Sequence, residues 1–278
     1  MNLKDFLKFP FFCFKLVLLN FESLNDNANF MEQLIYKSRQ TYFNAIVICS
    51  MYNVISMATF GFVNRDDFDK VSPNIPNVVT GSIICLKAVS VNIGKDEIRR
   101  IFQELDGIFK RRDSEIFERK VTIFMKKYAK IMKIYAGIMI FVFLPILVPF
   151  FNFFISGVTQ LPLNYWFPFE TIQPTPFFIA TLWVEFSSYN FLAILLACDT
   201  LLYALITIVA MEFDFLSFDL RSFKFPPKHE RAKVIKILVE RHSKLLELSD
   251  RLQNIFAPTF LCCFVISSLV MCFVAFQL

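Results

Sequence analysis

The sequence has little charge, few glycines and almost no histidine. Only 19% of its 278 residues are Asp, Glu, Lys or Arg, and it contains 6 Gly and 2 His. Soluble domains usually carry about 25% charged residues. No glycine-rich phosphate loop, dinucleotide fingerprint, HExxH or GxSxG motif occurs in it. The sequence therefore gives no indication of an enzyme.

Cysteine pairs of the kind that bind metals or undergo redox chemistry are also missing. The seven cysteines stand in apolar runs, without a CxxC pair or a Cys/His cluster. We expect them to be reduced thiols that pack as small apolar side chains. His229 and His242 lie in a charged stretch, where they are expected on a solvated helix. We predict no metal and no cofactor.

Apolar and aromatic residues are abundant instead. Hydrophobic residues make up 56% of the chain, which includes 37 Phe, and so much apolar surface needs lipid or a partner to cover it. The longest run, 177–211, carries only two charges, Glu185 and Asp199. As a helix it would be about 52 Å long, whereas the hydrocarbon core is about 30 Å thick. We predict one helix that crosses a membrane once and continues into water.

The same reasoning predicts an all-α, polytopic membrane helical bundle that forms a single membrane domain over 1–278. Residues 1–40 are apolar but interrupted by lysines, and they are expected to form an interfacial or re-entrant segment. The segment 212–254 is polar, helical in pattern and expected in the cytoplasm. Pro145 and Pro149 should kink or unwind the third span. The five predicted spans are 41–63, 76–94, 134–157, 177–211 and 255–278.

The positive charges predict the orientation of the chain. Lys and Arg number 5 in 1–40, 12 in 95–133 and 9 in 212–254, but only 2 in 64–75 and none in 158–176. Because loops rich in Lys and Arg stay in the cytoplasm, the N-terminus is expected inside. This asymmetry also explains the net charge of +5 without nucleic acid.

Two helix faces are candidates for a ligand site. Residues at i, i+4, i+7 and i+11 of the third span share one face, and residues at i, i+3, i+4 and i+7 of the fourth share another. One interpretation is ordinary helix packing. The other is an apolar pocket between the helices, closed from outside by the loop YWFPF, for small hydrophobic ligands. The candidate residues are Phe143, Leu147, Phe150 and Phe154, with Trp183, Phe186, Ser187 and Asn190.

Two further features have a bearing on function. An apolar heptad seam runs over 234–255 and is broken only by Arg241; it either packs on other segments of the same chain or joins subunits. Its candidate residues for oligomerisation are Leu238, Leu245, Leu248 and Leu252. Lys87, Glu185 and Asp199 lie within or near the membrane, where ionisable groups are usually paired or functional. The two acids are on the side of the fourth helix away from Trp183, and we place them outside the ligand pocket.

Two motifs resemble one known family. The loop LNYWFPFETIQPTPFF has a WFPF-D/E-T core at Trp166–Thr171 that resembles the second extracellular loop of insect odorant receptors. The stretch 242–278 is similar to the passage of that family into its fifth span, with H-x-x-L, F-[SA]-P and a late C-x-x-x-F from Cys272 to Phe276. The similarity is specific after residue 160 and diffuse before it. The inside N-terminus agrees with the family.

This resemblance implies a seven-span, ligand-gated cation channel in the plasma membrane, assembled as a tetramer with a co-receptor subunit. Its ligand would be a small hydrophobic odorant bound among spans two, three, four and six. The present sequence contains five spans, so spans six and seven, with the pore lining, are expected to be missing from it.

Two alternatives remain at this stage. Gustatory receptors share the architecture but carry their diagnostic motif in the seventh span. A membrane transporter or accessory protein should show internal repeats and helices broken at matching positions. The sequence shows a proline pair in the third span alone and no repeat.

Overall fold

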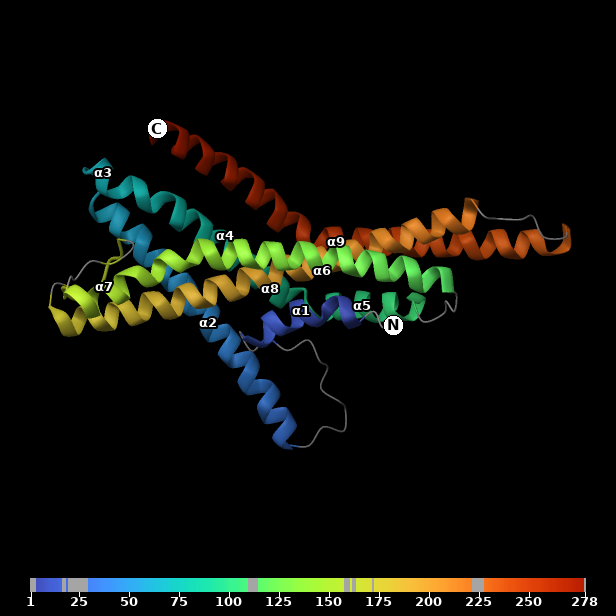
Figure 1. Ribbon diagram of the computed structural model, residues 1–278, viewed down its shortest axis with the longest axis horizontal. Coiled ribbons are helices and arrows are strands. Elements are labelled where there is room, and N and C mark those ends of the chain that lie inside the picture. Colours follow the sequence, from blue (N-terminus) through green and yellow to red (C-terminus); the bar gives the residue numbers. More distant parts are fainter. Residues whose placement is uncertain are drawn as a thin grey trace.

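The computed structural model describes residues 4–16, 19, 30–109, 115–157, 161, 164–171, 173–221 and 228–277 (Figure 1). Within these ranges every regular element is a helix. The predicted helical membrane bundle is confirmed. Four of the described helical segments are long and apolar enough to cross a membrane, namely Met31–Val63, Phe68–Ile93, Pro174–Arg221 and Arg231–Cys272.

The first half of the chain contains two of these segments. The span predicted at 41–63 is the end of a longer helix, because residues 30–40 continue the helix in more polar sequence. The span predicted at 76–94 corresponds to α4 almost residue for residue, with Pro76 in the first turn, where a missing N–H costs nothing. The elements are α1 (Lys4–Leu16), α2 (Phe30–Val63), α3 (Phe68–Val71), η1 (Ser72–Asn74), α4 (Ile75–Ile93) and α5 (Lys95–Phe109).

The third predicted span, 134–157, is divided among three elements. The helix α6 (Glu115–Phe143) gives way to the 3-10 helix η2 (Leu144–Leu147), and α7 (Val148–Ser156) follows. Pro145 is near the start of η2 and Pro149 near the start of α7, so the predicted break at the prolines is confirmed. Gly157 follows α7 with φ +66°, a left-handed conformation that favours glycine after a helix.

Two long helices complete the chain. They are α8 (Pro174–Arg221) and α9 (Lys228–Gln277), and they form a hairpin at one end of the molecule (Figure 1). The described residues of the polar segment 212–254 belong to the end of α8 and the first half of α9. The apolar end of α9 diverges from the bundle (Figure 1). Pro258, which removes a backbone donor, lies inside this helix.

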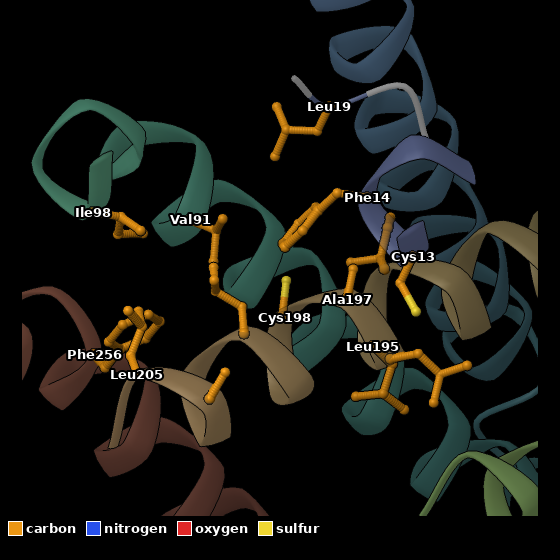
Figure 2. Packing of buried hydrophobic residues seen from close by; sticks show 14 of the residues in the cluster. Cys13, Phe14, Leu19, Val91, Ile98, Leu195, Ala197, Cys198, Leu205 and Phe256 are labelled. Atoms are coloured by element: carbon orange, nitrogen blue, oxygen red, sulfur yellow. The ribbon is translucent and has the colours of Figure 1, made fainter. Parts of the chain in front are cut away.

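The core is built around α8. Ile194, Leu201, Leu205 and Ile208 are each at most 1% exposed, and α1, α4 and α6 pack around this helix. Figure 2 shows Phe14 of α1 in the same cluster as Ala197 and Cys198 of α8 and Val91 of α4. The N-terminal helix α1 thus buries apolar side chains against protein at the middle of α8.

Candidate functional site

The predicted stripe on α8 is turned toward α2. The indole Nε1 of Trp183 donates a hydrogen bond of 2.8 Å to Oδ1 of Asn53, and the ring of Tyr52 meets the Trp183 ring edge-on at 5.9 Å. Ser187 and Asn190 are buried, and each donates to the backbone carbonyl four residues earlier in α8. Trp183, Ser187 and Asn190 therefore contribute to helix packing, whereas Phe186 is 44% exposed.

A different face of α8 meets α6. Tyr128 stacks on Tyr203 with 5.9 Å between ring centroids, and the hydroxyl of Tyr135 donates to Oδ2 of Asp199 at 2.6 Å. Residues advance by about 100° per position round an α-helix, so Asp199 is about 160° away from Trp183. The face of α8 that meets α6 at this level is therefore nearly opposite the face that carries Trp183.

The predicted stripe on the third span is partly open. Phe143, the last residue of α6, is half-buried against the core, and Leu147 in η2 is 41% exposed. Phe150 and Phe154 belong to α7, but their side chains lie outside the described residues. Because η2 contacts α8, the open part of this stripe borders the outer part of α8.

The loop before α8 is attached to α2 and η1. The backbone N–H of Trp166 donates to the carbonyl of Ser56, and the hydroxyl of Ser56 donates to the carbonyl of Trp166 at 2.5 Å. Asn74 Nδ2 donates to the carbonyl of Asn164, also at 2.5 Å. Tyr165 is buried with Met57 and Val184. Burial, followed by the nearby Glu185 charge, raises the pKa of Tyr165.

Sequence reasoning missed the polar residues of α2. Ser50, Asn53 and Ser56 are each at most 3% exposed, and two of them hold α8 and the loop. Their spacing of three within an otherwise apolar span is a visible signal, because polar side chains in a membrane helix usually bond to neighbouring helices.

Two of the membrane charges form a pair. Lys87 Nζ of α4 lies 2.6 Å from Oδ1 of Asp199, and Tyr135 binds the other oxygen of that carboxylate. The side chains of Lys87 and Asp199 are 18% and 26% exposed. The Oε1 atom of Glu185 is buried without a hydrogen-bond partner in the described structure. Across those same residues, no three His, Cys, Asp or Glu side chains are grouped as a metal site would require.

The heptad seam of α9 packs within the chain. Leu245 and Leu248 are fully buried and Leu252 is 7% exposed, whereas Leu238 is half-buried. Leu248 and Leu252 share a cluster with Ile98, Ile101 and Leu105 of α5. Of the two sequence interpretations, packing on other segments of the same chain accounts for Leu245, Leu248 and Leu252.

Charged groups surround this seam. Arg241, which breaks the seam in the sequence, lies 2.8 Å from Glu212 and 3.2 Å from Asp219 of α8. Arg251 bridges Glu97 and Glu104 of α5 at 2.5 and 2.8 Å, and Lys244 also reaches Glu104. The hydrogen bond from Arg251 is the main reason why the pKa of Glu104 is lowered. The polar ends of α5, α8 and α9 are therefore joined by ion pairs.

Comparison with known proteins identifies relatives of this chain. The family described as 7tm Odorant receptor matches residues 67–278. Odorant receptor 85b of Drosophila melanogaster is 30% identical over 120 residues, which are 43% of this chain and 31% of that protein. Putative odorant receptor 92a of the same organism is 38% identical over 82 residues, which are 29% of this chain and 20% of that protein. The matched part is thus under a third of the length of these relatives.

Solved structures share the fold. The insect olfactory receptor OR5 from Machilis hrabei covers 99% of this chain at a TM-score of 0.79 and 15% identity. The same receptor in complex with eugenol gives a TM-score of 0.81, again at 15% identity. In both cases the chain covers 71% of the receptor. Since the family match extends over most of its length, this chain, a membrane bundle of helices, belongs to the 7tm odorant receptor family.

Proposed function

We propose that this chain is an odorant-receptor subunit that binds small hydrophobic volatile molecules and, together with a co-receptor, gates a cation channel. The observation that carries the proposal is the family match over 67–278. The matched residues include the third span, the loop before α8, and α8 itself. The likeness to a receptor solved in complex with eugenol, a small aromatic compound, supports this ligand class.

The ligand is proposed to bind beside the break in the third span. Phe143 and Leu147 supply the described part of the apolar stripe. Phe150 and Phe154 are the further residues that the sequence pattern assigns to the site. Phe186 is the exposed aromatic side chain of the α8 candidates. Trp183 fixes α8 to α2 through Asn53, and Ser187 and Asn190 are buried on the same face of α8. Apolar burial supplies most of the affinity, at about 25 cal/mol per Å².

The test is displaceable binding of radiolabelled eugenol to the chain reconstituted in lipid nanodiscs. Phe143→Ala and Leu147→Ala should each weaken displaceable binding by about tenfold, since each removes about 1–3 kcal/mol of apolar contact. The matched control is Leu144→Ala: this residue is 55% exposed and is turned about 100° away from Phe143. An equal loss in the control, or no displaceable binding at all, would refute the site.

The chain is proposed to lie in the plasma membrane with its N-terminus in the cytoplasm. The support is the crowding of Lys and Arg into 1–40, 95–133 and 212–254. A cysteine at Lys70, which is 63% exposed, should react with an impermeant thiol reagent on intact cells. A cysteine at Lys236, which is 76% exposed, should react only after permeabilisation. The reverse pattern would invert the topology.

The co-receptor is proposed to pack on the outward face of α9. Because the leucine seam is buried within the chain, a subunit contact at this level needs another surface. Ile235, Val239 and Leu246 share such a face and are 48%, 57% and 46% exposed. Apolar residues exposed outside the bilayer usually mark a protein interface.

Val239→Asp should therefore abolish co-purification with a co-receptor in mild detergent. Lys233→Asp introduces the same carboxylate at an exposed position about 120° away from Val239 round the helix, and it should leave co-purification intact. Retention of the co-receptor by Val239→Asp would rule this face out.

A further inference from the structure

A cavity beside the half-buried ion pair of Lys87 and Asp199 has no role in the proposed function. It lies among α4, α8 and α9 and has a volume of about 110 Å³. Its lining combines two charged groups and three smaller polar groups with apolar walls. The lining includes Lys87, Asp199, Thr259, Cys198, Cys263 and Phe256.

The polar groups of the cavity differ in what they offer to a ligand. Both oxygens of Asp199 are engaged, one by Lys87 and the other by Tyr135. Asp199 accepts one of the three N–H donors that an ammonium carries. Within the described parts of the chain, Lys87 has no second acceptor. Thr259 is occupied as a donor to Ser90 at 2.9 Å. The strongest unused group at the cavity is therefore a hydrogen-bond donor, the Lys87 ammonium.

These groups select the charge and polarity of a ligand. Lys87 and Asp199 compensate each other, so an anion or a cation would bring an uncompensated charge into a region of low dielectric. A ligand that only donates would have to share a carboxylate oxygen of Asp199 that already accepts one hydrogen bond, whereas two N–H donors of Lys87 are unused. A neutral molecule with a hydrogen-bond acceptor fits both conditions, because its oxygen satisfies the ammonium and its carbon atoms contact Phe256 and the neighbouring apolar residues.

The volume limits the size of the ligand. An apolar protein cavity of about 150 Å³ holds benzene, which has six heavy atoms. A cavity of about 110 Å³ therefore admits a molecule of about four heavy atoms, such as acetone.

We propose that this cavity is a second ligand site, for small neutral carbonyl compounds whose oxygen accepts a hydrogen bond from Lys87. The cavity is separate from the site proposed beside the break in the third span: Asp199 follows Phe186 by 13 residues of α8, which is about 20 Å along the helix. A ligand here contacts α9 as well as α4 and α8. Its binding joins the diverging helix to the core.

Cys263 provides a direct readout. The solubilised full chain is treated with N-ethylmaleimide, and modification of each cysteine is followed by mass spectrometry. The probes are acetone and isobutene, which have nearly the same shape but differ in the acceptor oxygen. Acetone should slow modification of Cys263 at least threefold, and isobutene should have little effect. Cys262 and Cys272, which do not line the cavity, are internal controls that should react at unchanged rates.

Two variants separate the donor from the cavity itself. The double variant Lys87→Met with Asp199→Asn removes both charges together and avoids an unpaired buried ion. It should lose the protection by acetone. Leu202→Phe fills the cavity while the ion pair stays, and it should lose the protection as well. Equal protection by ketone and hydrocarbon would overturn the role of Lys87. If neither the ketone nor the hydrocarbon protected Cys263 in the unmodified, monodisperse chain, the proposed site would be refuted.

Discussion

The indole N–H of Trp183 in α8 donates a 2.8 Å hydrogen bond to the side-chain oxygen of Asn53 in α2. This bond links two helices that lie 130 residues apart in the sequence. It fixes which face of α8 meets α2, and consequently which face remains for α6, η2 and a ligand.

Loss of this bond should destabilise the bundle modestly. Hydrogen bonds between membrane helices contribute about 0.6 kcal/mol on average and up to about 1.7. Trp183→Phe and Asn53→Leu should each lower the free energy of unfolding by about 1 kcal/mol, measured by circular dichroism during denaturation with SDS. The double variant should cost less than the sum, because both changes remove the same bond. Full additivity would show that the two side chains act independently.

Gly81 should tolerate no larger residue, because α2 and α4 approach each other there. A Cβ at this position would lie 2.8 Å from Cγ2 of Val54. Gly81→Ala is therefore expected to cost about 1–3 kcal/mol through overpacking. Gly137 in α6 is the matched control, since nothing lies within 4 Å of its added Cβ. Gly137→Ala should stabilise by about 0.5–1 kcal/mol, as usual within a helix. Equal effects in the two variants would contradict the close approach.

Two neighbouring leucines of α9 should differ in their contribution to stability. Leu248 is fully buried and Leu246 is 46% exposed. Leu248→Ala should lower the free energy of unfolding of the isolated chain by about 2–5 kcal/mol. Leu246→Ala should change it by less than about 0.5 kcal/mol. If the order were reversed, the seam would not be the side that packs within the chain.

Acid should loosen the contact between α5 and α9. Arg251 lowers the pKa of Glu104 below its ordinary value of 4.5. A depressed carboxylate pKa stabilises the fold above about pH 4.5, and this stabilisation is lost as the pH falls through the lower, folded-state pKa. The melting temperature of the solubilised chain should therefore decrease when the pH is lowered below about 4.5.

The variant Glu104→Gln isolates this contribution. It should melt at a lower temperature than the unmodified chain at neutral pH, because it lacks the charge that Arg251 and Lys244 bind. Its further decrease on acidification should be smaller. Asp66→Asn is the control, since the Asp66 side chain is 98% exposed and its removal should leave the acid profile unchanged. Identical acid profiles for Glu104→Gln and the unmodified chain would exclude Glu104 as the titrating group.

The sequence by itself determined the membrane class, the helical architecture and the break in the third span. Each of these depends on local properties. A long apolar run forms a helix because its backbone groups must bond within the segment, and Pro145 and Pro149 interrupt that bonding wherever the helix lies. The ends of the long helices were harder to predict from the sequence. In α2 and α9 the helix extends beyond the apolar residues into polar sequence that also favours a helix.

Only the tertiary structure decided which faces meet. Periodicity groups Trp183, Ser187 and Asn190 on one side of α8, but it does not say which neighbour lies there, since the rotation of a helix is set by packing against its partners. The Lys87–Asp199 pair joins residues 112 positions apart, and the leucines of α9 meet α5 across more than a hundred residues. The local sequence pattern does not indicate which residues so far apart in the chain will be in contact. The choice between a seam that joins subunits and one that closes the chain on itself was therefore made by packing.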